Sequence, residues 1–391
     1  MKYFVIAGEA SGDLHAANLI NALREHDSDA HFYAYGGELM EAAGAKMLRY
    51  YRDIAYMGVV SVVMHAGTIL RAMARCKKEI MKVRPDVVIL VDYPGFNLAI
   101  AKYVKTKTSI PVYYYIAPKV WAWKENRIKL LRAYVDEIFS ILPFEGVFFK
   151  QRGVDIHYVG NPTVDEVEDF MRVHYADSRN DFTMSNGLDP KKKIIAILAG
   201  SRKQEINYNL RRMILAAQPF TEKEFQLVVA GAPNIDDNIY MRNIPSGMME
   251  NGDVRIVSGK TYGLLQFASC ALVTSGTATL ETALLRVPQV VCYYIPMGGI
   301  VSFLRKILLK VRFVSLVNLI AGDEIVKELV ADGMTTDNVR EALVKIAPGG
   351  SCRSRVLRGY EDVIRILGGS GASARAAQEM TLCLQRRKEN E

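Results

Sequence analysis

The chain begins with an apolar run, residues 2–7, that leads directly into a loop at residues 8–13 with the sequence Gly-Glu-Ala-Ser-Gly-Asp. An apolar run rich in β-forming residues is typical of a buried strand. The two glycines allow a sharp turn, and Ser11 or Asp13 can cap the helix that we expect to follow. A strand, a glycine loop and a helix in this order predict the ligand-binding corner of an open parallel α/β sheet.

The charge of this loop indicates what it binds. It contains no Lys or Arg and carries two acids, Glu9 and Asp13. These acids would repel a pyrophosphate group, whereas a carboxylate accepts hydrogen bonds from hydroxyl groups. The loop therefore favours a site for sugar hydroxyls. The alternative is an ordinary strand-to-helix turn, because glycine turns are common in α/β proteins.

Apolar runs alternate with helical periodicity along the chain, which predicts parallel sheets covered by helices on both faces. In the first half we expect strands at residues 2–7, 31–35, 87–91, 112–116, 138–141 and 157–159. After a polar segment the pattern restarts, with strands expected at residues 194–198, 226–230, 254–257, 271–274 and 289–294. The expected fold class is α/β, with two Rossmann-like, doubly wound domains that face a cleft.

A chain of 391 residues is long enough for two such domains. The polar segment at residues 177–193 contains Asn-Gly and Asp-Pro pairs, which are typical of a domain boundary. We therefore place the first domain at residues 1–185 and the second at 190–345. The helices of residues 346–391 are expected to pack back on an N-terminal domain, either their own or that of a second copy in a homodimer.

The composition argues against several classes of protein. The five cysteines are odd in number and form no Cys-x-x-Cys pair, which is typical of free thiols in the reducing cytoplasm. The six histidines form no ligand-spaced pair, so we expect no metal and no cofactor. The apolar N-terminus is too short for a secretory signal.

The formal net charge is +8, which favours an anionic partner. Residues 282–322 contain no acid. Basic residues, among them Arg305, Lys306 and Lys310, lie there between apolar ones. A basic amphipathic segment of this kind is typical of a helix on an anionic membrane surface. Nucleic acid is disfavoured, because no stacked aromatic residues separate the basic ones.

A second apolar segment covers residues 54–70, includes Val59, Val62 and Val63, and is followed by basic residues. It is slightly short for a transmembrane helix and contains small polar residues. We interpret both segments as contacts with lipid at a membrane surface. For each of them the alternative is a helix of the protein core.

Two motifs in the second domain follow predicted strands and suit a nucleotide diphosphate. In the first, Gly200 and Ser201 allow a close approach, and the guanidinium of Arg202 can bind phosphate oxygens. In the second, the start of a helix offers a dipole and the amides of Ser275, Gly276, Thr277 and Ala278 to an anion. Glu281, one turn further, can accept both hydroxyls of a ribose. The alternatives are an exposed turn arginine and a capped helix with a surface glutamate.

Asp92 follows the predicted strand 87–91 at its carboxyl end, where ligands bind in open sheets. A carboxylate flanked by Val91, Tyr93 and Phe96 can have a raised pKa and act as a general base. The alternative is a cap for the next helix. Trp121 and Trp123 either belong to the core or stack on a sugar or acyl chain, and we expect at least one of them in the core.

With these motifs the sequence resembles the lipid A disaccharide synthase family. The matching segments occur in the family's order at residues 8–13, 57–58, 92–97, 120–123, 142–145, 200–202, 275–281 and 318–322. The chain departs from the family pattern at Lys119, Ala199 and Val317, which lie at the edges of motifs. These departures concern the geometry of loops.

The resemblance implies a B-type glycosyltransferase that holds UDP in its second domain. The family joins UDP-2,3-diacylglucosamine to 2,3-diacylglucosamine 1-phosphate and forms the lipid A disaccharide 1-phosphate and UDP. The transfer is inverting, needs no metal and takes place at the inner face of the cytoplasmic membrane. On this chain Asp92 matches a carboxylate needed for activity, and three positions match residues around UDP, namely Arg202, Glu281 and Asn318.

We therefore expect Asp92 to take the proton from the acceptor 6-hydroxyl, and Arg202 with the amides near Ser275 to stabilise the departing UDP. The acceptor sugar is expected to contact Glu9, which we also count as catalytic, together with Ser11 and Asn97. Two other functions fit parts of the sequence. A UDP-sugar epimerase of the same fold would share the helix with Glu281, and a non-catalytic adaptor would use only the membrane-facing segments.

Overall fold

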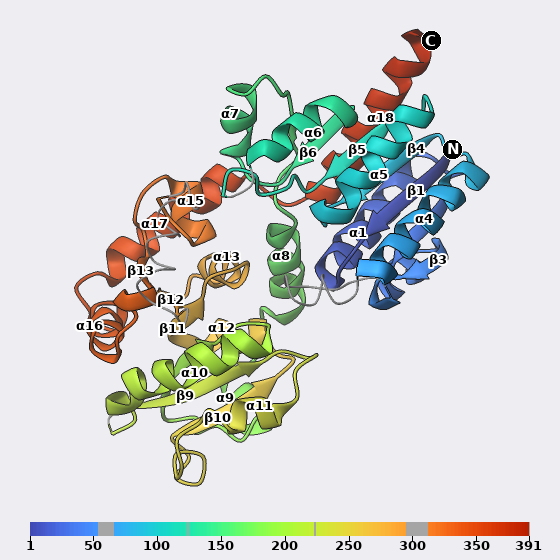
Figure 1. Cartoon of the computed structure of the whole chain (residues 1–391). Coiled ribbons are helices and arrows are strands. Elements are labelled where there is room, and N and C mark those ends of the chain that lie inside the picture. Colours follow the sequence, from blue (N-terminus) through green and yellow to red (C-terminus); the bar gives the residue numbers. More distant parts are fainter. Residues whose placement is uncertain (54–65, 123–124, 223, 295–311, 391) are drawn as a thin grey trace. The chain divides into compact units, whose positions relative to one another are not determined.

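The computed structural model describes residues 1–53, 66–122, 125–222, 224–294 and 312–390, which form two compact units (Figure 1). Unit 1 consists of Met1–Pro162 and Ser370–Glu391, and unit 2 consists of Thr163–Gly369. Each unit contains one parallel sheet with helices on its faces. The predicted class of two doubly wound α/β domains is therefore confirmed.

The sheet of unit 1 has seven strands in the order β3-β2-β1-β4-β5-β6-β7. The strands are β1 (Lys2–Ala7), β2 (His31–Gly36), β3 (Lys46–Tyr50), β4 (Val87–Val91), β5 (Val112–Tyr115), β6 (Glu137–Ser140) and β7 (His157–Tyr158). The α-helices are α1 (Ala10–His26), α2 (Glu38–Ala42), α4 (Ala66–Val83), α5 (Pro94–Lys107), α6 (Ile128–Tyr134), α7 (Glu145–Lys150) and α18 (Ala372–Asn390). The order of the strands reverses between the neighbours β1 and β4, which is a topological switch point.

Two apolar layers hold this sheet, one on each face. In β1, Tyr3 and Val5 face a core that includes residues of α1 and α18, whereas Phe4 and Ile6 face a core that includes residues of α4 and α5. All four side chains are fully buried, as expected for a central parallel strand with helices on both sides.

The sheet of unit 2 has six strands in the order β10-β9-β8-β11-β12-β13, with a switch point between β8 and β11. The strands are β8 (Lys193–Leu198), β9 (Phe225–Gly231), β10 (Val254–Ser258), β11 (Ala268–Thr274), β12 (Gln289–Tyr293) and β13 (Lys327–Val330). The α-helices are α8 (Pro162–His174), α9 (Arg179–Ser185), α10 (Lys203–Ala217), α11 (Asp237–Met241), α12 (Thr261–Phe267), α13 (Ala278–Leu284), α15 (Leu316–Ala321), α16 (Thr336–Ile346) and α17 (Arg353–Leu367).

The division of the chain differs from the predicted boundaries in two places. Unit 2 begins at Thr163 instead of residue 190, because Phe182 of α9 and Leu188 pack into the core of its sheet. Of the C-terminal helices, α17 belongs to unit 2, and the last one, α18, belongs to unit 1. The sequence analysis also missed the edge strands β3 and β13.

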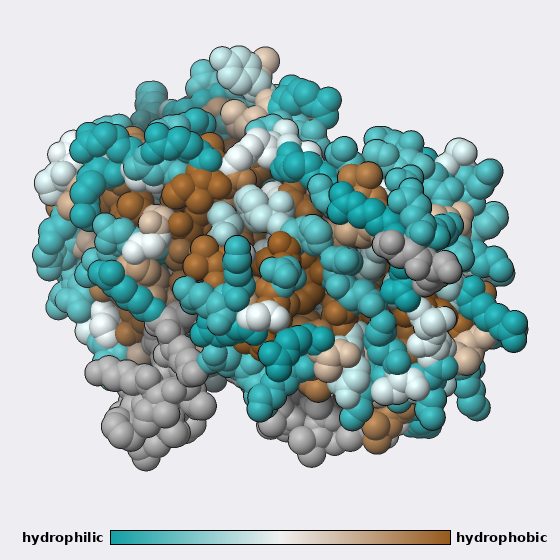
Figure 2. All heavy atoms as spheres, turned by 90° about the horizontal axis from the view of Figure 1, so that it is seen from above, coloured by the Kyte–Doolittle hydropathy of each residue, from teal (hydrophilic) through white to brown (hydrophobic). Residues whose placement is uncertain are grey.

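Hydrophilic side chains cover most of the face drawn in Figure 2, and hydrophobic residues show between them. None of the described helices is both long enough and apolar enough to cross a membrane. The residues predicted to contact lipid lie outside the described residues, namely Val59, Val62, Val63, Arg305, Lys306 and Lys310. Their membrane role therefore stays a prediction.

Candidate active site

The switch point of unit 1 brings together the two predicted motifs of the first domain. The loop at residues 8–13 follows β1, and Asp92 follows β4, the neighbouring strand. Ala7 pairs with Val91, so Gly8 and Asp92 leave the sheet at the same level of its carboxyl edge. This edge at a switch point is where open α/β sheets bind ligands.

The backbone at Asp92 is strained and firmly held. Asp92 has φ 43° and Tyr93 has φ 46°, in the left-handed region that residues other than glycine rarely adopt. The carbonyl of Asp92 accepts hydrogen bonds from the Tyr114 hydroxyl and, at 2.7 Å, from Nδ2 of Asn97. Asn97 is fully buried, so here its amide supports the Asp92 backbone; its predicted contact with the acceptor sugar stays untested.

The side chain of Asp92 is half-buried, and its pKa is raised to about 6. Burial is the main cause and the negative charge of Glu9 adds to it, whereas the positive charge of Lys119 opposes it. The alternative role as a helix cap does not fit, because the N-cap position of α5 is Tyr93 and no side chain caps it there. A carboxylate with this pKa can act as a general base near neutral pH.

The glycine loop departs from its prediction in one respect. The N-cap of α1 is Glu9, so neither Ser11 nor Asp13 caps that helix. The buried carboxylate of Asp13 instead accepts hydrogen bonds from the backbone amides of Gly37, Leu39 and Met40, at 2.7–3.2 Å. Asp13 therefore caps α2 from a neighbouring element, because three amides at a helix start stabilise a negative charge.

Two contacts fix the top of this loop. A Cβ atom at Gly8 would lie 2.2 Å from the Tyr93 ring, so the ring packs against the turn only because residue 8 is glycine. The hydroxyl of Ser11 donates a hydrogen bond to the Glu9 carboxylate at 3.2 Å. Glu9 and Asp92 thus lie near each other at the edge of the sheet, and Glu9 is half-buried.

Unit 1 also contains a buried carboxylate to which the sequence analysis gave no role. Glu145 is almost fully buried and accepts hydrogen bonds from Nε1 of Trp121, at 2.7 Å, and from the Ser140 hydroxyl. Burial raises its pKa to about 7. Trp121 is buried, which confirms that one of the two tryptophans belongs to the core, and Trp123 lies outside the described residues.

The switch point of unit 2 places its two motifs side by side in the same way. Gly200 comes two residues after β8 and Ser275 one residue after β11, and Leu198 pairs with Val273. Gly200 has φ 116°, a conformation that requires glycine. Arg202 forms an ion pair with Glu205, with Nη1 2.9 Å from Oε1, and its side chain is 63% exposed. An incoming anion can therefore replace Glu205 as the ion-pair partner of the guanidinium.

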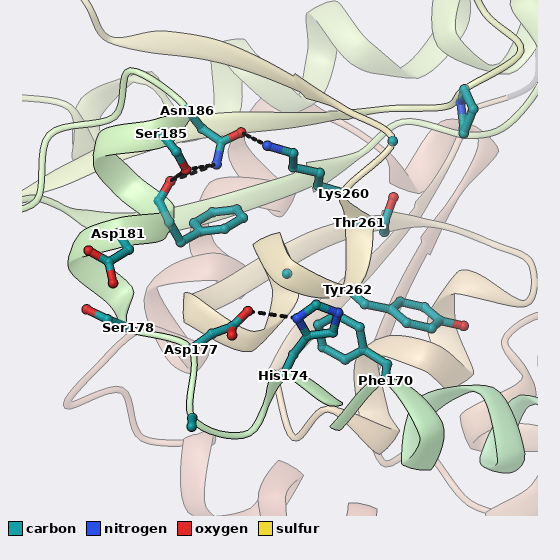
Figure 3. Close-up of a pocket in the computed structure, with 15 residues that line it drawn as sticks. Phe170, His174, Asp177, Ser178, Asp181, Ser185, Asn186, Lys260, Thr261 and Tyr262 are labelled. Atoms are coloured by element: carbon teal, nitrogen blue, oxygen red, sulfur yellow. Dashed lines mark hydrogen bonds and ion pairs between the residues drawn. The ribbon is translucent and has the colours of Figure 1, made fainter. Parts of the chain in front are cut away.

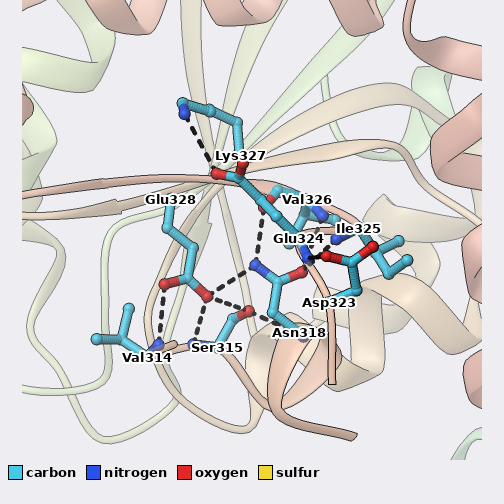
Figure 4. A network of polar contacts seen from close by, with 9 residues as sticks. All are labelled: Val314, Ser315, Asn318, Asp323, Glu324, Ile325, Val326, Lys327 and Glu328. Atoms are coloured by element: carbon cyan, nitrogen blue, oxygen red, sulfur yellow. Dashed lines mark hydrogen bonds and ion pairs between the residues drawn. The ribbon is translucent and has the colours of Figure 1, made fainter. Parts of the chain in front are cut away.

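Asn318 is part of a polar network that supports the second motif (Figure 4). Asn318 is fully buried. Its Oδ1 atom accepts hydrogen bonds from the backbone amides of Ile325 and Val326. Its Nδ2 atom donates hydrogen bonds to the carboxylate of Glu328 and to the carbonyl of Val326. Glu328 also accepts the amides of Val314 and Ser315, both at 2.9 Å.

This network reaches the start of α13. The backbone amide of Val314 donates a hydrogen bond to Glu328. The carbonyl of the same residue accepts a hydrogen bond of 2.8 Å from the Ser275 hydroxyl. Within the part of the chain that the structure describes, Asn318 therefore supports the loop beside Ser275, and all the hydrogen-bonding groups of its side chain are used. Its predicted contact with UDP remains untested.

Glu281 lies in a second cluster, together with Tyr262 of α12 and Glu166 of α8. The Tyr262 hydroxyl donates a hydrogen bond to Oε2 of Glu166 at 3.4 Å, and burial together with the charges of Glu281 and Glu166 raises the pKa of Tyr262. Burial raises the pKa of both carboxyl groups to about 7, and the charge of Glu166 contributes to the shift at Glu281. The sequence analysis found Glu281 and missed its two neighbours.

A hollow of about 830 Å³ opens beside Tyr262 (Figure 3). It is lined by the end of α8, by α9 and by the turn from β10 into α12. The Phe170 ring stacks on His174, and Lys260 donates a hydrogen bond to Asn186 at 3.0 Å. The hollow lies within unit 2 at the carboxyl end of β10, and it offers both aromatic and polar walls to a ligand.

Comparison with known proteins finds relatives of this chain over nearly its whole length. The family model described as Lipid-A-disaccharide synthetase matches residues 3–364. The Lipid-A-disaccharide synthase of Myxococcus xanthus is 36% identical over 382 residues, which cover 97% of this chain and 96% of the relative. That of Syntrophus aciditrophicus is 36% identical over 377 residues, which cover 95% of each chain.

Solved structures share the fold at low sequence identity. The UDP-GlcNAc 2-epimerase of Neisseria meningitidis bound to UDP-GlcNAc has a TM-score of 0.65 and 13% identity, with 99% of this chain and 100% of that chain covered. CalG4, the calicheamicin glycosyltransferase, has a TM-score of 0.58 and 18% identity, with 98% of each chain covered. At these identities the likeness concerns the fold alone.

Proposed function

The chain belongs to the lipid-A-disaccharide synthase family and is a glycosyltransferase of lipid A synthesis, and from this premise we propose how its two switch points share the reaction. Its substrates are a UDP-sugar and a lipid, UDP-2,3-diacylglucosamine and 2,3-diacylglucosamine 1-phosphate. The alternative of a UDP-sugar epimerase is not favoured, because its support is a likeness of fold at 13% identity.

The switch point of unit 2 holds the UDP part of the donor. Among the described residues, no hydrogen bond uses the amides of Gly276, Thr277 or Ala278, which leaves them for the diphosphate. Arg202 exchanges Glu205 for a phosphate oxygen and stabilises the charge that grows on UDP as the sugar leaves. Glu281 accepts the ribose hydroxyls, and the hollow beside Tyr262 is large enough for further parts of the nucleotide.

The switch point of unit 1 activates the acceptor. Asp92 takes the proton from the 6-hydroxyl of the acceptor sugar, which then attacks the anomeric carbon of the donor with inversion of configuration. Glu9 and Ser11 bind hydroxyls of the acceptor, and Asn97 holds the backbone of Asp92 in place. Since Arg202 and the amides supply the positive charge, we expect transfer to continue in the presence of a chelator.

The observation that carries this assignment is the position of Asp92, which follows β4 at the carboxyl edge of the sheet on a backbone held by Asn97 and Tyr114. Its raised pKa fits the role of a base. The test is a thin-layer assay of the full chain with both acylated substrates. We expect formation of the disaccharide and of UDP, and no use of water-soluble UDP-GlcNAc. If UDP-GlcNAc were consumed as fast as the acylated donor, the assignment would fail.

Association with a membrane surface is a separate part of the proposal. Both substrates carry acyl chains, and the basic residues Arg305, Lys306 and Lys310 would hold the protein on anionic lipid. The triple change of these residues to Glu should release the protein from anionic vesicles and leave UDP affinity unchanged. Binding with an unaltered dependence on salt would contradict this part.

A further inference from the structure

We propose that Glu137, His157 and Cys383 bind one zinc ion in unit 1. The three side chains come from β6, β7 and α18, and their ligand atoms all lie within 4.8 Å of one another. Glu137 and His157 are the first residues of their strands, so the cluster lies at the amino edge of the sheet, opposite the edge that carries Asp92. The proposal is independent of the roles assigned above to the two switch points. It departs from the expectation that the chain binds no metal, because these three residues are far apart in the sequence and meet only in the folded unit.

The sheet fixes the first two ligands on one face. Phe139 pairs with His157 across β6 and β7, and Glu137 lies two residues before Phe139, so its side chain is on the same face. The His157 ring stacks on Phe139, with the ring centroids 5.1 Å apart. Its Nε2 atom lies 2.8 Å from Oε2 of Glu137. A ring held by stacking is already oriented for a metal on Nε2.

The third ligand comes from the helix that covers this face. Cys383 is 9% exposed and belongs to the core formed by α1, α18 and the sheet. The end of α18 is fixed by Arg387, which donates hydrogen bonds to Asp136 and, at 2.9 Å, to the carbonyl of Ser109. The sulfur atom is thereby held over the starts of β6 and β7.

A fourth residue supports the histidine from the other side. Glu379 lies one turn before Cys383 on α18, and its Oε2 atom is 3.9 Å from Nδ1 of His157. A histidine that binds a metal through one ring nitrogen usually donates its other N–H to a carboxylate, which fixes the tautomer. Glu379 lies on the Nδ1 side of the ring, and a rotation of its exposed side chain would bring the carboxylate within hydrogen-bond distance.

The donor set selects the metal. One imidazole nitrogen, one thiolate and one carboxylate suit Zn²⁺, whereas Mg²⁺ and Ca²⁺ prefer oxygen ligands alone. Tetrahedral zinc with bonds of about 2.0–2.3 Å places its ligand atoms about 3.3–3.8 Å apart. The cluster has one separation of 2.8 Å, and none exceeds 4.8 Å. Small side-chain rotations of Glu137 and Cys383 would therefore complete the site, with water as the fourth ligand.

Binding exchanges protons for the metal. A metal binds the thiolate of cysteine and the free ring nitrogen of histidine, so the protons on these atoms must leave when it binds. Zinc forms bonds to nitrogen, sulfur and oxygen, and the protons of the imidazolium and the thiol are released to solvent. No electron transfer is involved.

The experiment titrates Co²⁺, a spectroscopic substitute for Zn²⁺, into the reduced and chelator-treated full chain. We expect one equivalent to produce a near-ultraviolet thiolate-to-cobalt band and intense visible bands, and Zn²⁺ but not Mg²⁺ to abolish them. Cys383→Ser should lose the near-ultraviolet band, whereas Cys352→Ser, at a partly exposed cysteine, should keep it. Absence of the band in the unaltered protein, or its persistence in Cys383→Ser, would overturn the proposal.

A second variant covers the case in which Cys383→Ser does not fold. Glu379→Gln changes a side chain that is 44% exposed, so the fold should tolerate it. Loss of the carboxylate partner of His157 should weaken Zn²⁺ binding about ten-fold or more. Equal affinity in Glu379→Gln and in the unaltered protein would contradict the arrangement. UDP affinity, measured in parallel, should not change, because the cluster lies in unit 1 and the UDP motifs lie in unit 2.

Discussion

The two units share one winding pattern and differ in the charge at their switch points. In unit 1 the strands β1 and β4 lead into acids, Glu9 and Asp92. In unit 2 the equivalent strands β8 and β11 lead into Arg202 and the start of a helix. The same sheet edge can therefore serve opposite chemistry, because the fold fixes where loops emerge and the loop residues decide what they attract.

The difference extends to the way each site is held. Asp92 lies on a strained left-handed backbone, and Asn97 and Tyr114 hold it by hydrogen bonds to its carbonyl. Arg202 is an exposed side chain whose ion-pair partner, among the described residues, is Glu205. A proton acceptor needs a fixed direction and a raised pKa, whereas a phosphate ligand must be able to change partners.

The comparison is tested most strongly at Asp92. Asp92→Asn should lower kcat by at least about 100-fold, because the general base is lost, and leave UDP affinity unchanged. In the unaltered protein the rate should fall as pH drops below about 6, since only the ionised carboxylate accepts a proton. Asp155→Asn, at an exposed aspartate of the same unit, is the matched control. Normal turnover of Asp92→Asn would show that unit 1 does not supply the general base through this residue.

Arg202 gives the corresponding test in unit 2. Arg202→Ala should also reduce turnover about 100-fold, through loss of charge stabilisation on the departing UDP. Unlike the change at Asp92, it should weaken the binding of UDP as well. The control is Arg211→Ala, an exposed arginine on α10, the helix that Arg202 precedes. An unaltered UDP affinity in isothermal titration would place the diphosphate elsewhere.

A smaller effect should distinguish the carboxylates of the two units by their pH dependence. The pKa of Glu281 is raised to about 7, so a ribose that requires the ionised form should bind more weakly as pH falls below 7. One linked proton changes the affinity by at most about ten-fold per pH unit. Glu281→Gln should remove this part of the pH dependence of UDP affinity. Because UDP ionises equally in both experiments, its own contribution cancels when the two pH profiles are subtracted.

Glu166 sharpens the same measurement. Glu166→Gln removes a negative charge next to Glu281, so the pH dependence should move to lower pH. Glu168→Gln, exposed on the same helix α8, should leave it in place. A shift in the opposite direction would contradict the coupling of the two carboxylates.

The smallest effect is expected at Asn318, where the measured quantity is stability. Asn318→Ala leaves the amides of Ile325 and Val326, the second of them buried, without their acceptor, which should cost about 1–3 kcal/mol of unfolding free energy in a denaturant titration. Asn238→Ala, at an exposed residue of unit 2, should cost much less. A loss of UDP affinity without a loss of stability would instead place Asn318 in contact with the nucleotide.

The sequence predicted the central strands because they are mostly apolar runs, as in β4, where every residue is apolar and buried. It missed β3 and β13 because these edge strands carry polar residues and are mostly half-exposed. The predicted boundary at residues 185–190 followed composition. The structural one at Pro162 depends on which core α9 joins, and a local pattern does not contain that information.

The same limit applies to the candidate site. Asp92, Arg202 and Glu281 were predictable, because each follows a recognisable strand within a few residues. Tyr262, Glu166 and Glu328 were not, since each acts on a motif from a different element and reaches it only in the folded unit. Asp13 was recognised as important but was assigned to the wrong helix, because the amides it caps begin 24 residues later.

The position of α18 has a consequence for biosynthesis. This last helix lies against α1 and supplies Ala376, Ala377 and Met380 to the core under the N-terminal sheet. A ribosome synthesises every residue of unit 2 before it synthesises α18. Unit 1 is therefore started first, but its core can be completed only after unit 2 has been made. A chain that stops at Gly369 would leave the apolar surface that α18 covers exposed on unit 1, and such a surface favours aggregation.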